Sequence, residues 1–510
     1  MKTTRSSRAK LNSITTLANQ IITTVTGLII PRMMLGAFGS ALYGATTSIA
    51  QFLSYISLLE SGVGRAARAA LYKPLADRDS EKVSKVYFAI VRFFRYVAII
   101  FCVYTILLAF SYYDIANVRE INREYVIFLV IAISLSTLIE YLCGISNMTL
   151  INADQRKYIT NSAIIVTRIL NTVLILVLIN LGSGIITVKL GSSLIIILRP
   201  LFLSWYVKKH YTLRKTSRVK TGRRDDALPQ KWTGMSQHIA YFVHSNTDVV
   251  LLTVFSDLRL VAVYAIYSLV TISIRNIVFS LAGGLEAELG DMYAKGEQET
   301  LTRKYKQYQF IMSFSSVLLF GVTALMILPF VLLYTSGITD VNYFQPAFAL
   351  LLILGEVLNC LALPCSTLPV SCNQLKKTRW GAYGEAVINI VFSCALIWWN
   401  PLLSVAIGTL TAEVFKLFYY SVYASKRIIK NSVFRQLLRH TLVFAAVLLF
   451  GFSGIFLFPL LRVQNYFIWI LYAIPATVIA LGISLAIMRI CYGDELKITL
   501  KRTIALFRRA

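Results

Sequence analysis

The chain has 510 residues, of which 57% are hydrophobic and 15% charged, and its formal net charge is +27. Apolar runs of about 20 residues fill most of it, and this is the length that crosses a bilayer core as a helix. The composition therefore excludes a soluble globular protein. The basic balance is explained by membrane orientation, so no nucleic-acid partner is expected.

The apolar runs, taken in chain order, predict about fourteen transmembrane helices in an all-α polytopic membrane protein. They are separated by short polar segments, and no GxxxxGK[ST] segment is present that would hold ATP. We expect the helices at 12–35, 42–64, 88–112, 124–150, 158–180, 184–206, 233–255, 261–287, 308–334, 346–370, 379–399, 402–424, 441–461 and 467–489.

The polar segments alternate between basic and nearly uncharged. If the N-terminus is inside, the cytoplasmic segments hold 38 of the 51 Lys and Arg residues and the outer segments hold four. Because Lys and Arg accumulate in cytoplasmic loops, both termini are predicted to be cytoplasmic. The seven cysteines form no CxxC pair and lie in or near the apolar runs, so neither a disulfide nor a metal site is predicted.

The sequence also predicts two similar halves. When the second half is aligned on the first with Tyr264 on Tyr43, the polar positions of helix 7 fall on polar positions of helix 1. Six helices per copy is an even number, so both copies insert in the same orientation, as a parallel repeat. We predict an N-terminal lobe of six helices, a basic cytoplasmic linker, a C-terminal lobe of six helices, and helices 13 and 14 with a basic tail, at 1–207, 208–231, 232–428 and 429–510.

Polar side chains recur at helical spacing on the first hairpin of each predicted lobe. Such a stripe faces a cavity or a neighbouring helix, because polar groups gain little from contact with lipid. Hydrogen bonding between helices is the alternative for about half of these positions. The candidates for the lining of a substrate cavity are Asn19, Gln20, Gln51, Tyr241, Ser245, Tyr264, Tyr267 and Thr271.

Two arginines lie near the centres of predicted helices, where an ionised group must pair or meet water. These residues, Arg168 and Arg275, have planar donor groups that suit a diphosphate. The alternative is an internal salt bridge to a carboxylate. An arginine that exchanges a carboxylate for a phosphate would satisfy both interpretations. The candidate partners are Glu140, Asp248 and Glu356.

Several ionisable residues are candidates for binding a coupling ion. His244 and Asp248 lie one turn apart on helix 7, and Glu356 lies within helix 10. They either bind a coupling H+ or Na+ or form structural hydrogen bonds. Glu413 and Lys416 are three residues apart and are expected to neutralise each other in a structural role, with Glu385 nearby. No resident cofactor is predicted.

Four segments resemble one family. KKTRWGAYGEAVINIVFSCALIWWN and VAIGTLTAEVFKLFYYSVYASKRI, within 376–428, resemble the C-terminal half of bacterial polysaccharide exporters. NQIITTVTGLIIPRMMLGAFGSALYG and TLINADQRKY (149–158) resemble the first helix and the helix 4–5 turn of the same family. These exporters are the Wzx-type oligosaccharide flippases, whose superfamily also contains multidrug and toxic-compound exporters and lipid II flippases.

The resemblance implies two six-helix lobes around a central cavity, with two additional helices, in the bacterial cytoplasmic membrane. It implies a non-enzymatic flippase that moves a polyprenyl-diphosphate-linked oligosaccharide by alternating access, with Arg275 matching the cavity cations of the family. The cargo would supply O-antigen of lipopolysaccharide, capsule or exopolysaccharide, and the polymerase and glycosyltransferases of that pathway would be partners. A cation-coupled multidrug or small-molecule exporter, and a membrane-embedded sugar enzyme, are the alternatives.

Overall fold

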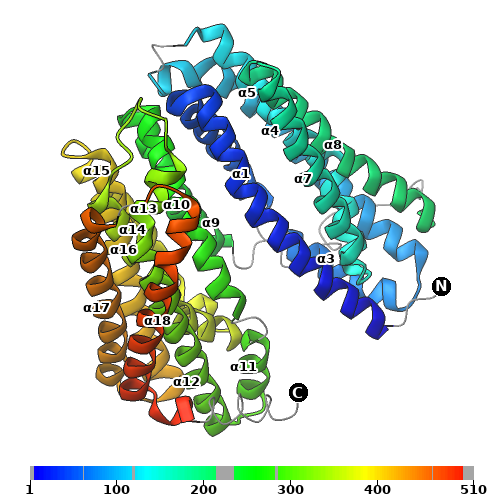
Figure 1. Ribbon diagram of the computed structural model, residues 1–510. Coiled ribbons are helices and arrows are strands. Elements are labelled where there is room, and N and C mark those ends of the chain that lie inside the picture. Colours follow the sequence, from blue (N-terminus) through cyan, green and yellow to red (C-terminus); the bar gives the residue numbers. More distant parts are fainter. Residues whose placement is uncertain are drawn as a thin grey trace. The chain divides into compact units, whose positions relative to one another are not determined.

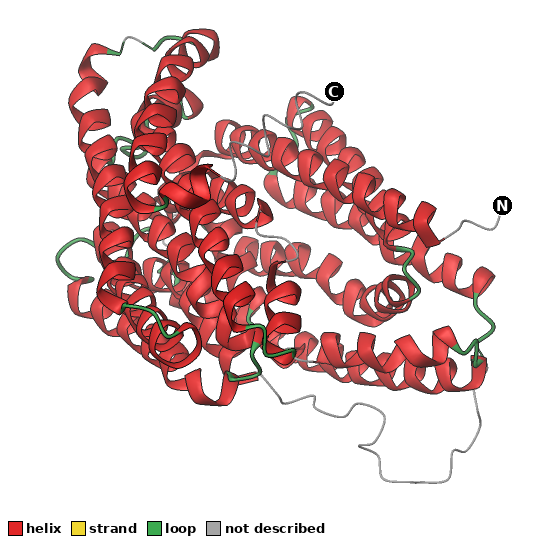
Figure 2. Ribbon diagram, turned by 90° about the horizontal axis from the view of Figure 1, so that it is seen from below, coloured by secondary structure: helices red, strands yellow, loops and turns green. Residues whose placement is uncertain are grey.

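The computed structural model describes residues 5–60, 63–117, 121–213, 235–281, 285–461 and 463–497, with the side chains at 5, 6, 65, 235–241 and 243–245 left out. The described part is helical, with short loops and no strand (Figure 2). This confirms the predicted all-α class.

Eleven helical stretches among the described residues are long and apolar enough to cross a membrane, which supports a multi-pass membrane protein. The first, Ser7–Glu60, spans 54 residues and covers two of the predicted helices. Gly39 interrupts it with a φ of 75°, a conformation that suits glycine. The predicted helices near 233–255 and 379–399 are present as helices but are not among the eleven stretches. The count of fourteen membrane-spanning helices therefore stays a prediction.

Residue contacts divide the chain into two units, of which the first comprises Met1–Phe242 and Ser256–Ala262. In this unit α1 and α8 pack on α7, and α5 packs on α4 and α8. Its helices are α1 (Arg5–Ser54), α2 (Ser57–Glu60), α3 (Val63–Ala76), α4 (Ser80–Ile115), α5 (Arg123–Ile139), the π-helix η1 (Glu140–Gly144), α6 (Ile145–Ala153), α7 (Lys157–Asn180) and α8 (Ile185–His210).

The second unit comprises Val243–Phe255 and Val263–Ala510. Its α16 packs against both α14 and α15, and the last two helices, α17 and α18, pack against α13 (Figure 1). The first residues of α9 and α10 are assigned to the first unit. The helices of the second unit are α9 (Met235–Phe255), α10 (Leu258–Leu281), α11 (Leu285–Ala294), α12 (Gln298–Ser315), η2 (Ser316–Phe320), α13 (Gly321–Tyr334), α14 (Pro346–Ser371), α15 (Leu375–Leu396), α16 (Pro401–Tyr423), η3 (Ala424–Ile429), α17 (Val433–Leu457), η4 (Phe458–Leu460) and α18 (Tyr466–Cys491).

Short polar side chains begin several of these helices. The Asn400 side-chain oxygen accepts a hydrogen bond from the Leu403 N–H at 3.0 Å, with Pro401 at the first helical position. Asn465 caps α18 in the same way, at 2.9 Å from the Ile468 N–H. These caps satisfy N–H groups that the first turn of a helix leaves without a partner.

Two turns of the first half recur in the second half at the same spacing along the chain. Arg78 and Gly296 both have a positive φ, of 55° and 73°, and so do Gln155 and Asn373, at 57° and 55°. The helices that follow these turns begin at the same spacing. The alignment of Tyr264 on Tyr43 expected from the sequence is therefore wrong by three positions. Three positions make nearly one helical turn, which explains why polar residues still coincided in the wrong alignment.

Candidate functional site

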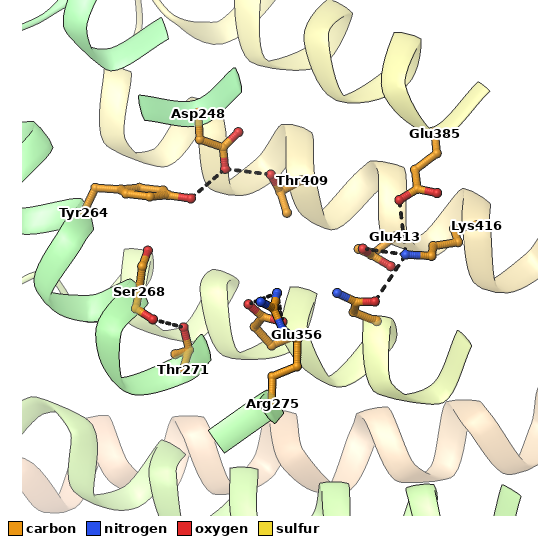
Figure 3. Close-up of polar contacts among 11 residues, drawn as sticks. Asp248, Tyr264, Ser268, Thr271, Arg275, Glu356, Glu385, Thr409, Glu413 and Lys416 are labelled. Atoms are coloured by element: carbon orange, nitrogen blue, oxygen red, sulfur yellow. Dashed lines mark hydrogen bonds and ion pairs between the residues drawn. The ribbon is translucent and has the colours of Figure 1, made fainter. Parts of the chain in front are cut away.

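A buried carboxylate on α9 connects three helices of the second unit. Asp248 is 4% exposed. Its Oδ2 accepts hydrogen bonds from the Tyr264 hydroxyl on α10 and the Thr409 hydroxyl on α16, each at 3.0 Å (Figure 3). The Asn389 amide on α15 donates to the Thr409 hydroxyl at 2.9 Å. A polar layer thus crosses the unit from α10 to α15.

Arg275 is paired with Glu356. Its Nη1 lies 3.1 Å and 3.2 Å from the two carboxylate oxygens of Glu356 on α14 (Figure 3). Both side chains are largely buried, at 19% and 11% exposure. This is one of the salt bridges that the sequence offered as the alternative to a phosphate contact. The pairing offsets part of the cost of burying a guanidinium.

A second charged cluster lies nearby. The Lys416 ammonium on α16 is 3.1 Å from Glu385 on α15 and 3.2 Å from Glu413 on its own helix (Figure 3). It also donates to the Asn359 side-chain oxygen on α14 at 3.2 Å. The expected contact between Glu413 and Lys416 is present, and Glu385 joins it.

The first unit has a separate set of charged residues. The Arg199 guanidinium on α8 donates to Glu140 in η1 at 2.7 Å, and the next residue, Tyr141, donates to Glu60 at 2.7 Å. A π-helical turn of this kind aims neighbouring side chains in different directions and is frequent at functional sites. Among the residues that the structure describes, Arg168 on α7 forms no ion pair. The positive charge of Arg199 lies near enough to repel that of Arg168.

The other residues predicted to line a substrate cavity lie in several places. The Tyr267 hydroxyl donates to the Tyr343 carbonyl at 2.8 Å, and Thr271 is fully buried and bonds to the Ser268 carbonyl. Gln51 donates to Ser54 at 3.4 Å. Gln20 is exposed on α1, and Asn19 is half-buried. The side chains of Tyr241, His244 and Ser245 lie outside the described residues, so the expected pairing of His244 with Asp248 stays a prediction.

Sequence reasoning missed Thr409, Asn389 and Arg199. A signal for Thr409 was present, because Thr409, Glu413 and Lys416 follow the i, i+4, i+7 pattern of one helical face. Arg199 gave no such signal, since its position near the end of an apolar run also suits a side chain that reaches the headgroups.

The turn at 149–158 that contributed to the resemblance is held in place by polar contacts with other segments. Asp154 accepts a hydrogen bond from Tyr211 at 2.8 Å and pairs with Arg156 at 2.8 Å. Burial and the Asp154 charge raise the pKa of Tyr211, so its hydroxyl stays protonated and donates. The Asn12 side chain accepts from the Tyr158 N–H at 2.8 Å and thereby fastens α1 to the start of α7.

Comparison with solved structures identifies the fold. The chain is similar to the lipid II flippase MurJ in an inward closed conformation, with a TM-score of 0.69 and 13% identity over 95% of this chain and 99% of MurJ. It is also similar to an inward-facing multidrug resistance MATE transporter of the MOP superfamily, with a TM-score of 0.56 and 17% identity over 80% of this chain and 95% of that one.

A third similar structure is the MATE multidrug transporter DinF-BH, with a TM-score of 0.55 and 14% identity over 83% of this chain and 97% of the other. No family model and no curated protein matches the sequence. These neighbours are transporters and not enzymes. The chain therefore has the fold of the MOP-superfamily transporters.

Proposed function

We propose that this protein is a flippase that moves a polyprenyl-diphosphate-linked oligosaccharide across the bacterial cytoplasmic membrane. The cargo supplies surface polysaccharide, as O-antigen, capsule or exopolysaccharide. The observation that carries the proposal is the Arg275–Glu356 pair, because a guanidinium paired with a carboxylate within the membrane can exchange that carboxylate for a phosphate. The fold shared with a lipid II flippase supports it.

In this mechanism the head group enters from the cytoplasmic side, and Arg275 leaves Glu356 to bind the diphosphate. Arg168 supplies a second cation. The hydroxyl and amide groups of the candidate lining, including Asn19, Gln20 and Gln51, bind the sugars. Alternating access of the two lobes releases the head group outward while the prenyl chain stays in the lipid.

The exchange takes the Arg275 guanidinium away from the Glu356 carboxylate, and the loss of that counter-charge is costly inside a membrane. Uptake of H+ or Na+ at that moment would neutralise it. This requirement links cargo binding to a coupling ion, with Glu356, Asp248 and His244 as its candidate sites. The polysaccharide polymerase and the glycosyltransferases of the pathway are the partners that consume and make the cargo.

The experiment that tests the proposal is depletion of the protein in its native bacterium, with mass spectrometry of the polyprenyl-diphosphate-linked sugars. We expect finished repeat units to accumulate while surface polysaccharide falls. Depleted cells that express Arg275→Ala should export about ten- to a hundredfold less than cells that express the wild type, because a charge-assisted contact to the cargo is lost. The variant should still insert into the membrane.

The matched control is Lys304→Ala. Lys304 on α12 pairs with Glu288 on α11, outside the proposed site, and the substitution removes the cation of that pair. It should restore export. Unchanged lipid-linked sugars after depletion would contradict the flippase. Full rescue by Arg275→Ala would remove that residue from the mechanism.

The second candidate function is a cation-coupled exporter of small molecules. The buried Asp248 carboxylate favours it, since a membrane-embedded carboxylate with hydroxyl neighbours suits an exchangeable cation. Drug resistance that appears on overexpression and is lost in Asp248→Asn, together with unchanged lipid-linked sugars, would establish this function in place of the first.

A further inference from the structure

One face of α4 is exposed along most of the length of the helix. The residues of this stripe follow one another at helical spacing, and each is between 55% and 61% exposed. They are Tyr96, Ile99, Val103, Ile106 and Phe110. Such a face on a membrane-spanning helix meets either lipid or a helix of another chain.

Two arginines lie at the end of the stripe that is predicted to be cytoplasmic. Arg92 and Arg95 are both exposed, and neither forms an ion pair within the part of the chain that the structure describes. Because they are three residues apart, their side chains are neighbours on the surface of the helix. Two guanidinium groups are therefore free to bind the same anion.

The length of the stripe places these arginines at the membrane surface. At the other end of the stripe, Asp114 is exposed and pairs with Arg123 at 3.2 Å. The axial distance from Arg95 to Asp114 is about 28 Å at the rise of an α-helix, and the hydrocarbon core of a bilayer is about 30 Å thick. The arginines thus reach the headgroups of one leaflet, with Tyr96 at the interface beside them.

The equivalent face in the second half is covered by protein. Counted from the N-cap of each helix, Phe310 and Ser313 of α12 stand where α4 has its two arginines. Both residues are buried. The Ser313 hydroxyl lies 3.5 Å from that of Tyr492, which follows α18, and the Phe310 ring contacts the Tyr492 ring edge-on. In the first half the corresponding positions are charged and uncovered.

Small residues allow α17 to approach α13 on the covered face. A Cβ added to Gly321 would lie 2.9 Å from the Phe450 ring, and Gly454 lies against the Ala324 carbonyl oxygen. Close contact between membrane helices depends on such residues. The stripe on α4 has only large side chains and contains no glycine, alanine or serine. Its composition is therefore that of a surface that meets lipid chains and not that of a helix interface.

We propose that α4 binds an anionic phospholipid, with Arg92 and Arg95 holding the phosphate and the acyl chains lying along the stripe. The donor groups of arginine suit a phosphate. The cytoplasmic leaflet carries anionic lipids that attract basic side chains at this depth. The site lies within the first unit and uses none of the residues proposed for the cargo, so it does not rest on the flippase function.

Native mass spectrometry of the purified protein in detergent tests the proposal. The probes are phosphatidylglycerol and phosphatidylcholine with the same acyl chains, titrated separately. The wild type should bind phosphatidylglycerol more tightly than phosphatidylcholine. Arg92→Gln combined with Arg95→Gln should weaken binding of phosphatidylglycerol about tenfold, because both charges at the phosphate are lost, and should leave phosphatidylcholine unaffected.

The matched control combines Lys82→Gln with Lys85→Gln on the same helix. These lysines are also exposed and three residues apart, but they lie about 15 Å farther along the helix, beyond the headgroups. The control removes the same charge and should bind phosphatidylglycerol as the wild type does. Equal affinity of the wild type for both lipids would contradict the proposal, and so would an equal loss in the two double variants.

A second measurement distinguishes lipid from a partner helix. A photo-crosslinking amino acid at Val103, in the middle of the stripe, should give no adduct with another protein when intact cells are irradiated. An adduct of protein mass would show that a helix of another chain covers the stripe and would overturn the proposal. Both measurements proceed without cargo, so a failure of the proposed flippase function would leave their outcomes unaffected.

Discussion

Glycines set how closely the helices that carry the charged residues approach each other. At Gly408, α16 lies so near α15 that an added Cβ would overlap the Ser393 hydroxyl and lie 2.8 Å from the Asn389 carbonyl oxygen. At Gly144, an added Cβ would lie 2.6 Å from the carboxyl carbon of Glu140. Each glycine thereby fixes the position of a polar side chain or of the backbone beside it.

Gly408→Ala should destabilise the protein, because the added methyl group forces α15 and α16 apart. We expect a loss of about 1–3 kcal/mol in the free energy of unfolding. The measurement is thermal unfolding in detergent, followed by tryptophan fluorescence. Gly482→Ala on α18 is the control, since nothing lies within 4 Å of its added Cβ. It should be neutral or stabilising by up to about 1 kcal/mol. Equal unfolding temperatures for the two variants would refute the prediction.

The sequence predicted that Arg275 needs a partner but not which one. An arginine in the middle of a membrane-spanning helix is costly to bury without an anion or water beside it. This requirement does not depend on how the helices pack. The choice among Glu140, Asp248 and Glu356 depends on which helices adjoin, and Glu140 contacts Arg199 in the other unit. Spacing along one chain contains no such information.

A single amide fastens α17 to several other helices. The Gln436 Nε2 donates to the Tyr305 hydroxyl on α12 at 3.1 Å and lies 3.1 Å from the Cys365 sulfur on α14. Its side-chain oxygen accepts from the Ser425 hydroxyl in η3. Ser425 is fully buried, so its hydroxyl depends on this acceptor, whereas the Tyr305 hydroxyl also donates to the Cys365 sulfur at 3.3 Å.

Gln436→Leu should loosen α17, because it leaves the buried Ser425 hydroxyl without its acceptor at a cost of about 1–3 kcal/mol. Thermal unfolding of the purified variant measures the effect. On the same helix, Thr441→Ala removes an exposed hydroxyl that bonds only to the Leu437 carbonyl, and it should change stability little. An unfolding temperature of Gln436→Leu that equals that of Thr441→Ala would show that the amide network contributes nothing.

At the level of elements, apolar run length located the long helices but missed α3, which lies between the predicted helices at 42–64 and 88–112. Hydropathy could not register the π-helix at Glu140–Gly144, because it depends on local hydrogen bonding and not on composition. Nor could it separate repeat spacings that differ by nearly one turn. The turn residues resolved that difference, since a positive φ marks one position in the backbone.

Across the whole molecule, exposed tryptophans lie near the ends of a predicted membrane-spanning helix. Trp398 and Trp399 follow α15 on the predicted outer side and are 81% and 68% exposed. Trp380 lies near the opposite end of the same helix and is 65% exposed. Tryptophan gathers at both membrane–water interfaces, so these positions mark where α15 leaves the lipid.

The orientation predicts the side from which introduced cysteines react. Thr339→Cys, in the exposed loop between α13 and α14, should be labelled in intact cells by a membrane-impermeant maleimide. Glu297→Cys, in the exposed turn between α11 and α12, should be labelled only after the cells are opened. Cells with the unsubstituted protein measure the reactivity of the native cysteines. The reverse pattern of labelling would place both termini outside.

The left-handed turn residues that recur at constant spacing have an evolutionary consequence. Duplication and fusion of a gene for a six-helix chain would produce such a repeat. Arg78 and Gly296 then descend from one ancestral position, and so do Gln155 and Asn373. Turns whose backbone conformation is the same in both halves are the ones that the fold requires. Glu385 falls on Thr167 at the same spacing, so its charge was gained or kept in one half alone.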